Sequence, residues 1–262
     1  LFRSKCFHIS FKIEESESAY IVAWTNFILL FFSIILTLNS NYFHKSKIIL
    51  LANNISNFTT ERFILFYDFF DLKKGSSFLC CMPSMYIGGI MMLIRAIVNE
   101  GVIFLEKPSR YPIQRLNEKI DLCAMTTAQT RNAIQIPKRM EFIRNLLIGG
   151  GELTNDDDFN LSKLETSCFH SFGMTETISH IALRSIDSKT EDKLYQCLNH
   201  VQISNNNENR LVIKSKKIGI ESLTTNDIVK IVGNQLFIYI GRMGNIINSG
   251  GIKIHAEQIE KT

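Results

Sequence analysis

The stretch FIRNLLIGGGELT, residues 142–154, decides the fold class. Its apolar run is continuous rather than alternating, which is typical of a strand that is buried on both faces. A glycine turn follows the run directly. Similar buried runs occur at 76–83 and 165–173, and a helical pattern at 86–101 lies between them. Strands that alternate with helices predict an α/β fold with a mostly parallel sheet flanked by helices in layers.

Further elements extend this pattern toward both ends. Residues 27–38 predict a buried strand, and residues 45–70 predict a helix because apolar residues recur every three to four positions. A short strand is expected at 102–108. Within 110–134 we expect a helix, then a strand, then the start of a second helix.

The character of the sequence changes after about residue 187. Four short apolar runs, NHVQIS, RLVIKS, DIVKIVG and QLFIYIG, are separated by turns rich in Asn and Gly. This spacing predicts a small antiparallel β unit, at about 188–243, appended to an α/β body that ends near residue 187.

Composition and charge exclude several classes of protein. The chain has 262 residues, 45% of them hydrophobic, and a net charge of only +4. Its basic residues are scattered rather than clustered, which argues against nucleic-acid binding. The apolar run 27–38 is too short for a membrane-spanning helix. The six cysteines lack metal-ligand spacing, so we expect buried, reduced thiols and a cytoplasmic location.

Ligands of open α/β sheets bind at the carboxyl ends of the strands, and three loops are expected there. They are the segment after 27–38, the loop IGGGEL, and SFGMTETISH at 171–180. The last of these contains hydroxyls, one carboxylate and His180 between flanking apolar residues. Each has an ordinary interpretation: a glycine turn, a Thr-Glu cap, or an interior histidine.

The order of the motifs identifies a family that the chain resembles. FGMTET resembles the Tyr-Gly-x-Thr-Glu motif of adenylate-forming enzymes, TND resembles their ribose-binding segment, and GRMGNIINSGGIKIHAEQIE resembles their closing signature. Within this group the chain looks most like o-succinylbenzoate–CoA ligases of menaquinone synthesis. The resemblance implies the large N-terminal domain of an AMP-forming acid–CoA ligase that uses ATP, Mg²⁺ and coenzyme A. Its other partner would be a small carboxylic acid; the oligomeric state stays open.

The resemblance also implies roles for individual residues. Catalytic roles fall on Thr175, Glu176 and Lys253, with Glu176 as the magnesium ligand. The implied nucleotide-binding residues are Thr37, Ser40, Lys45, Gly149, Gly150, Gly151, Phe172, Gly173, Asp227 and Arg242. For the acid, the candidates are His180 and Tyr86, of which Tyr86 also has a purely structural interpretation.

The chain departs from the family pattern in its phosphate loop and near its end. The loop position reads TLNSNYFHKSK at 37–47, where Asn39 and Tyr42 replace glycines. Glycines let backbone N–H groups curl around phosphate oxygens, so this cradle is altered. The family's hinge acid is Gly244 here. The expected division is therefore an AMP-binding domain at 1–243, with a hinge and the start of a truncated C-terminal domain at 244–262.

Three alternatives stay open, of which the second is favoured by these departures. One is an acyl-CoA ligase for a different acid. Another is a degenerate or truncated relative that binds nucleotide or a partner without full catalysis. A plain α/β domain of unknown role is the third, and the order of the motifs argues against it.

Overall fold

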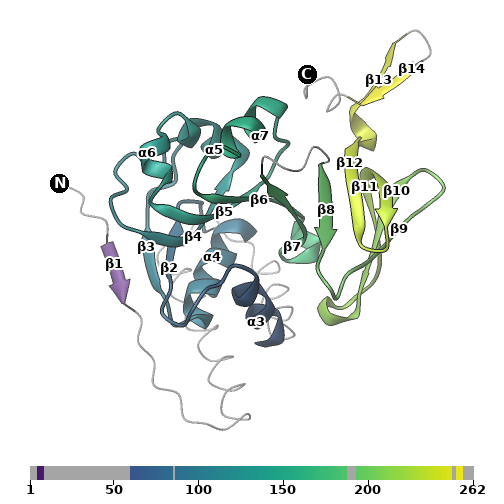
Figure 1. Cartoon of the computed structure of the whole chain (residues 1–262). Helices are drawn as coiled ribbons and strands as arrows, with labels where there is room; N and C mark the ends of the chain where they lie inside the picture. The colour runs from purple at the N-terminus through teal and green to yellow at the C-terminus, as the bar shows by residue number, and fades with distance from the viewer. Residues whose placement is uncertain (1–4, 9–59, 85, 188–192, 250–251, 256–262) are drawn as a thin grey trace, which may run out of the picture.

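The computed structural model describes residues 5–8, 60–84, 86–187, 193–249 and 252–255 (Figure 1). The predicted strand 27–38 and the first part of the predicted helix 45–70 lie outside the described residues. The end of that helix is confirmed as α3 (Thr60–Phe69).

A sheet of 12 strands organises the described chain. Its parallel part has the order β3-β2-β4-β5-β6, which confirms the predicted α/β body. These strands are β2 (Ser77–Cys80), β3 (Val102–Leu105), β4 (Ile120–Thr126), β5 (Ile143–Gly149) and β6 (Ser167–Gly173). Strand β1 (Lys5–His8) pairs antiparallel with β3 at the edge.

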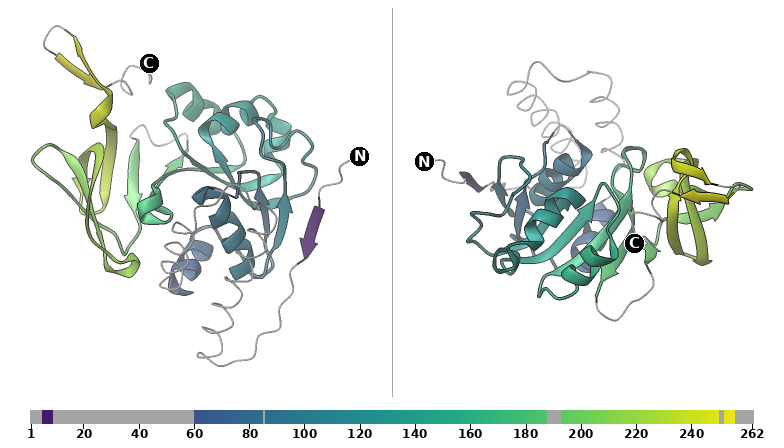
Figure 2. Two further views of the ribbon diagram at one scale, coloured as in Figure 1. Left: turned by 180° about the vertical axis from the view of Figure 1, so that it is seen from behind. Right: turned by 90° about the horizontal axis from the view of Figure 1, so that it is seen from above.

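Helices cover both faces of the parallel strands. They are α3 together with α4 (Ile87–Val98) on one face, and α5 (Thr127–Ile134), α6 (Pro137–Met140) and α7 (Asn155–Leu161) on the other (Figures 1 and 2). Neighbouring residues of one strand belong to different core clusters: Leu122 packs with α3 and α4, whereas Cys123 packs with the opposite layer. This two-sided burial explains why the strands read as continuous apolar runs.

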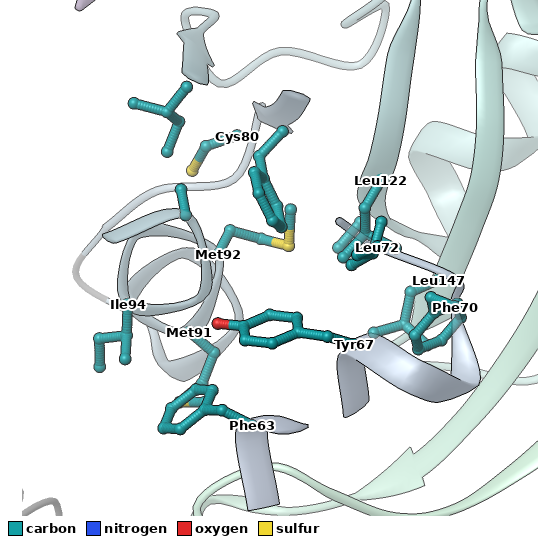
Figure 3. Packing of buried hydrophobic residues seen from close by; sticks show 14 of the residues in the cluster. Phe63, Tyr67, Phe70, Leu72, Cys80, Met91, Met92, Ile94, Leu122 and Leu147 are labelled. Atoms are coloured by element: carbon teal, nitrogen blue, oxygen red, sulfur yellow. The ribbon is translucent and has the colours of Figure 1, made fainter. Parts of the chain in front are cut away.

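The α3–α4 layer is held by aromatic and sulfur-containing side chains (Figure 3). Tyr67 extends from α3 toward α4, and its hydroxyl donates a 2.8 Å hydrogen bond to the Arg95 carbonyl. The helices α5 and α7 each begin with a capping box, at Thr126 and Thr154. Such reciprocal bonds satisfy backbone N–H groups that have no partner within the helix.

The helix expected at the beginning of 110–134 is wrong, because the structure has only turns between β3 and β4. Ile113 and Leu116 are both buried, and a single turn closed by their backbones is enough to bury them. The Leu116 carbonyl then accepts a 2.6 Å hydrogen bond from Arg139 Nη1. Carbonyls at the end of a helical turn have no partner within it, and Arg139 supplies one here.

The antiparallel β unit is confirmed, and it continues the same sheet rather than forming a separate one. From β6 the order runs β7-β8-β12-β11-β10-β9, with antiparallel pairing throughout. The strands are β7 (His180–Ile186), β8 (Leu194–Cys197), β9 (Gln202–Asn205), β10 (Arg210–Ser215), β11 (Ile220–Gly233) and β12 (Leu236–Arg242). A separate hairpin of β13 (Ile246–Ser249) and β14 (Ile252–His255) follows.

Two further expectations can be compared with the described residues. Cys80 and Cys81 are buried free thiols, as expected, and burial raises the pKa of Cys80 to about 11. Among the helices that the structure describes, none has the length and apolar content needed to cross a bilayer.

Candidate functional site

A pocket of about 390 Å³ lies where the parallel strands β2, β4, β5 and β6 end. We call it the strand-end pocket. This location agrees with the rule that open α/β sheets bind ligands at the carboxyl ends of their strands. Its lining includes Met82, Tyr86, Met91, Arg95, Thr126, Gly149, Gly150, Ser171, Gly173, Thr175, Ile178, Ser179 and His180.

We call Gly149–Gly151 the glycine loop. Gly149 and Gly150 line the strand-end pocket, and Gly151 follows them directly. Gly150 has φ +81°, a backbone conformation that side-chain-bearing residues rarely adopt, and the space where a Cβ would sit is open. At Gly151 an added Cβ would lie 2.6 Å from the Thr127 hydroxyl. Gly150 therefore presents bare backbone, and Gly151 packs tightly against Thr127 of α5.

The FGMTET segment is a tight turn between β6 and β7 rather than an open loop. The 3-10 helix η1 (Thr175–Thr177) is closed by the Thr177 hydroxyl, which accepts a 3.0 Å hydrogen bond from the Met174 backbone N–H. Gly173 permits the hairpin, because an added Cβ would lie 2.6 Å from the His180 Cα. The turn thereby directs Thr175 and His180 to the same pocket.

Ile178 carries backbone strain at the centre of this turn. Its φ is +66° and its ψ is −39°, and the Ser179 backbone N–H bonds the Thr177 carbonyl at 2.7 Å. This is a γ-turn with positive φ, a strained conformation, above all for a β-branched residue. Ile178 is 4% exposed, so core packing holds the strained turn in place beside the pocket.

Arg95 is a buried charge that the sequence did not single out. It lies on α4 and is 4% exposed, with its guanidinium 4.2 Å from the centroid of the Phe66 ring. Its Nη2 donates to the Ser179 hydroxyl at 2.9 Å and lies 3.4 Å from His180 Nδ1. The sequence did contain a signal for it: Arg95 is the single charged residue within the apolar helix α4. Because charged side chains are rarely buried unless they are paired, an arginine at such a position indicates a partner or a ligand.

A second cavity of about 390 Å³ lies on the other side of Arg95. We call it the aromatic pocket. Its lining includes the phenylalanines Phe63, Phe66, Phe69, Phe70 and Phe169. Met91, Arg95, Ser179 and His180 line both pockets. The guanidinium therefore stands between two mostly apolar pockets.

The predicted site residues divide into those that line the strand-end pocket and those that do not. Six line it: Tyr86, Gly149, Gly150, Gly173, Thr175 and His180. Glu176 is exposed on η1, next to the lining residue Thr175. Phe172 faces the other side of β6, with its ring centroid 5.1 Å from that of Phe237 and 6.0 Å from that of Tyr239.

Asp227 and Arg242 form a pair in the β unit. They are partners in the β11–β12 ladder, and Arg242 Nε lies 3.5 Å from Asp227 Oδ1. Asp227 is 7% exposed, and the Thr225 hydroxyl accepts a hydrogen bond from its backbone N–H at 3.0 Å. Neither residue is part of the strand-end pocket lining, so their roles stay predictions.

Other predicted residues lie outside what the structure describes in full. Thr37, Ser40 and Lys45 are outside the described residues, and for Lys253 only the backbone in β14 is described. In the described part of the chain no group of three or more His, Cys, Asp or Glu residues is arranged to hold a metal ion. A magnesium ion held mainly by phosphate oxygens needs only one or two carboxylates, which the exposed Glu176 fits.

A buried histidine behind the glycine loop also escaped the sequence reasoning. His170 on β6 is 3% exposed, and burial lowers its pKa to about 4. Its Nε2 lies 2.8 Å from the Gly151 carbonyl oxygen. Because a carbonyl only accepts, Nε2 carries the proton.

Stability is expected to fall on mild acidification because of His170. Its folded pKa lies below the unfolded value of about 6.5, so the unfolded state binds more protons between these values and stability is lost as pH falls. From pH 7.5 to 5.5 this amounts to about 1.3 kcal/mol. Urea unfolding should show that extra loss in wild type relative to His170→Gln. Equal losses in both proteins would contradict the assignment.

Comparisons with known proteins agree with this geometry. No protein-family model and no curated protein matches the sequence. The structure is similar to that of an acyl-CoA synthetase (AMP-forming)/AMP-acid ligase II-like protein from Dyadobacter fermentans, with 29% sequence identity and a TM-score of 0.64. The match covers 76% of this chain and 58% of that chain.

Two structures of o-succinylbenzoate coenzyme A synthetase from Bacillus subtilis are also similar. One is a complex with ATP and magnesium, with a TM-score of 0.63, 17% identity, and coverage of 76% of this chain and 48% of that chain. The other holds the acyl-adenylate intermediate, with a TM-score of 0.64, 17% identity, and coverage of 77% and 48%. The chain thus spans about half the length of these solved structures, and it has the fold of the N-terminal domain of adenylate-forming enzymes.

Proposed function

We propose that this chain is the nucleotide- and acid-binding part of an AMP-forming acid–CoA ligase. One observation carries the proposal: the glycine loop, the FGMTET turn and the buried Arg95 all meet in the strand-end pocket. Bare backbone and hydroxyls suit a nucleotide, and a buried guanidinium suits a carboxylate. Support comes from the similar structures that hold ATP with magnesium, AMP or an acyl-adenylate.

The proposed reaction has two steps. The carboxylate of the acid attacks the α-phosphorus of ATP, the bond to pyrophosphate breaks, and an acyl-adenylate forms. The thiol of coenzyme A then loses its proton and attacks the acyl carbon, and AMP leaves. Thr175 in the pocket would donate a hydrogen bond from its hydroxyl to the α-phosphate, and Glu176 beside it would hold Mg²⁺. The ion would supply charge neutralisation at the phosphate oxygens.

The remaining nucleotide contacts follow from the family resemblance. The glycine loop, with Gly173 beside it, would lie against adenine, and Asp227 with Arg242 would bind the ribose hydroxyls. The resemblance also implies that Phe172 stacks on adenine, although its ring packs against Phe237 and Tyr239 on the other side of β6. Lys253, the lysine of the closing signature, would have a catalytic role. Thr37, Ser40 and Lys45 would contact the β- and γ-phosphates.

We propose o-succinylbenzoate as the acid, and hence a cytoplasmic role in menaquinone biosynthesis. The acid carries an aromatic ring and a second carboxylate, and burying an unpaired carboxylate is very costly. Arg95 supplies a permanent positive charge between the two pockets, and the phenylalanines of the aromatic pocket suit a ring. His180 and Tyr86 complete the lining on the acid side.

Two alternatives retain support. The pockets would also suit another aromatic or apolar acid. The replacement of phosphate-loop glycines by Asn39 and Tyr42 favours a protein that binds nucleotide without full turnover.

The proposal predicts that AMP binds about as well as ATP, because the residues that the resemblance assigns to adenine and ribose match the family pattern, whereas the phosphate loop is altered. Asp227→Asn should weaken both nucleotides about tenfold, since a charged hydrogen-bond acceptor is lost. Calorimetry tests this, with Glu221→Gln, an exposed acid on the same strand, as control. A chain that binds neither nucleotide would refute the proposal. A strong preference for ATP that is lost in Lys45→Ala would show that the altered loop still grips phosphate.

A further inference from the structure

Three consecutive carbonyl oxygens, beginning with that of Gly151 at the end of the glycine loop, are each bonded by a different side chain. Gly151 O lies 2.8 Å from His170 Nε2, Glu152 O accepts from Arg131 Nη2 at 3.1 Å, and Leu153 O accepts from Lys193 Nζ at 3.2 Å. The donors come from β6, from α5 and from the segment that enters β8. These three hydrogen bonds hold the backbone of residues 151–153 in place against the rest of the protein.

His170 is in turn oriented by a residue of the β unit. Since Nε2 carries the proton, Nδ1 of the neutral ring is an acceptor, and the Tyr195 hydroxyl donates to it at 2.6 Å. Both residues are 3% exposed. Burial lowers the pKa of His170 to about 4 and raises that of Tyr195. Both groups are therefore neutral near pH 7, and each hydrogen bond has one fixed direction.

Tyr195 sits where the β unit meets the body. It is the ladder partner of Phe237 on β12, and the two rings stack at 5.2 Å between centroids with an angle of 13° between planes. The same strand, β12, carries Arg242, the partner of Asp227. Contacts from Gly151 through His170 and Tyr195 to Phe237 therefore connect the proposed adenine wall to β12, the strand that carries the proposed ribose-binding Arg242.

We propose that Tyr195 and His170 are a positioning pair that sets the glycine loop for nucleotide binding and ties its position to that of the β unit. This inference rests on the proposed function. Neither residue needs to touch the nucleotide. Their effect passes through the Gly151 carbonyl, whose direction determines how the backbone of the loop faces the pocket.

The test uses Tyr195→Phe, which removes one hydroxyl and keeps the stacked ring, with Tyr111→Phe, an exposed tyrosine, as control. Amide hydrogen exchange at 149–152 should become about fivefold faster, as expected for the loss of one hydrogen bond, while exchange in the core of β4 stays unchanged. AMP affinity should fall by a similar factor.

His170→Leu should likewise speed amide exchange at 149–152 and lower AMP affinity. His170→Gln, which keeps an N–H donor, should show a smaller loss than His170→Leu.

The outcomes separate the inference from the proposed function. If wild type binds no AMP, the proposed function fails, but loop exchange in Tyr195→Phe still decides the pair. Unchanged exchange, or equal acceleration in the loop and in β4, would overturn the inference because the pair would then only contribute to global stability. No recovery in His170→Gln relative to His170→Leu would also overturn it.

Discussion

Replacing Arg95 by methionine is expected to remove acid binding while AMP binding persists. The guanidinium is the buried positive charge at the junction of the two pockets. Loss of one partner of a buried, hydrogen-bonded charge pair costs about 3 kcal/mol, or roughly a 100-fold loss of affinity. The fold should tolerate the change, because methionine fills similar volume without a buried charge.

Calorimetry with o-succinylbenzoate in the presence of AMP measures this effect, and a fatty acid of similar length is the comparison ligand. Arg95→Lys should bind the acid with intermediate affinity, since it keeps the charge but lacks the planar fork. His180→Ala should reduce the preference for o-succinylbenzoate and leave AMP affinity intact. Unchanged acid affinity in Arg95→Met would remove Arg95 from the site. A changed AMP affinity would instead show that Arg95 supports the turn through Ser179.

The largest loss of stability is expected from Asp158→Asn. This carboxylate on α7 accepts two hydrogen bonds from Arg184, at 2.9 and 3.1 Å, and pairs with Lys193 at 3.0 Å. The Arg184 side chain is 7% exposed and that of Asp158 is 17% exposed. Removing the carboxylate leaves two largely buried cations uncompensated, which costs about 3–5 kcal/mol of unfolding free energy.

Urea unfolding tests this prediction, with Asp156→Asn as the matched control. Asp156 is an exposed acid on the same helix, and its change should stay within about 0.5 kcal/mol. The double variant Asp158→Asn/Arg184→Met should recover part of the loss, because it removes one of the stranded cations. The buried Arg184 Nε also has no hydrogen-bond partner in the described structure. A loss below about 1 kcal/mol in Asp158→Asn would show that solvent compensates the cluster.

Burial patterns explain which elements could be predicted. Most strands of the body and of the β unit follow from local runs of apolar residues, and each such prediction within the described residues is confirmed. Strands β1, β7 and β8 were not predicted. The helix expected near residue 113 is wrong because one turn from Ile113 to Leu116 is enough to bury both side chains. Arg139, 23 positions away, bonds the carbonyl at the end of that turn, and no local pattern shows this contact.

The sequence by itself determined the α/β class, the antiparallel β unit and the turns that border the pocket, because these depend on hydrophobic periodicity and on glycine. Tertiary structure alone decided that Arg95 meets Ser179 and that His170 links Tyr195 to Gly151. These contacts join residues 84, 25 and 19 positions apart. A buried polar side chain must find a partner, but only the packing of strands and helices determines which partner lies within reach.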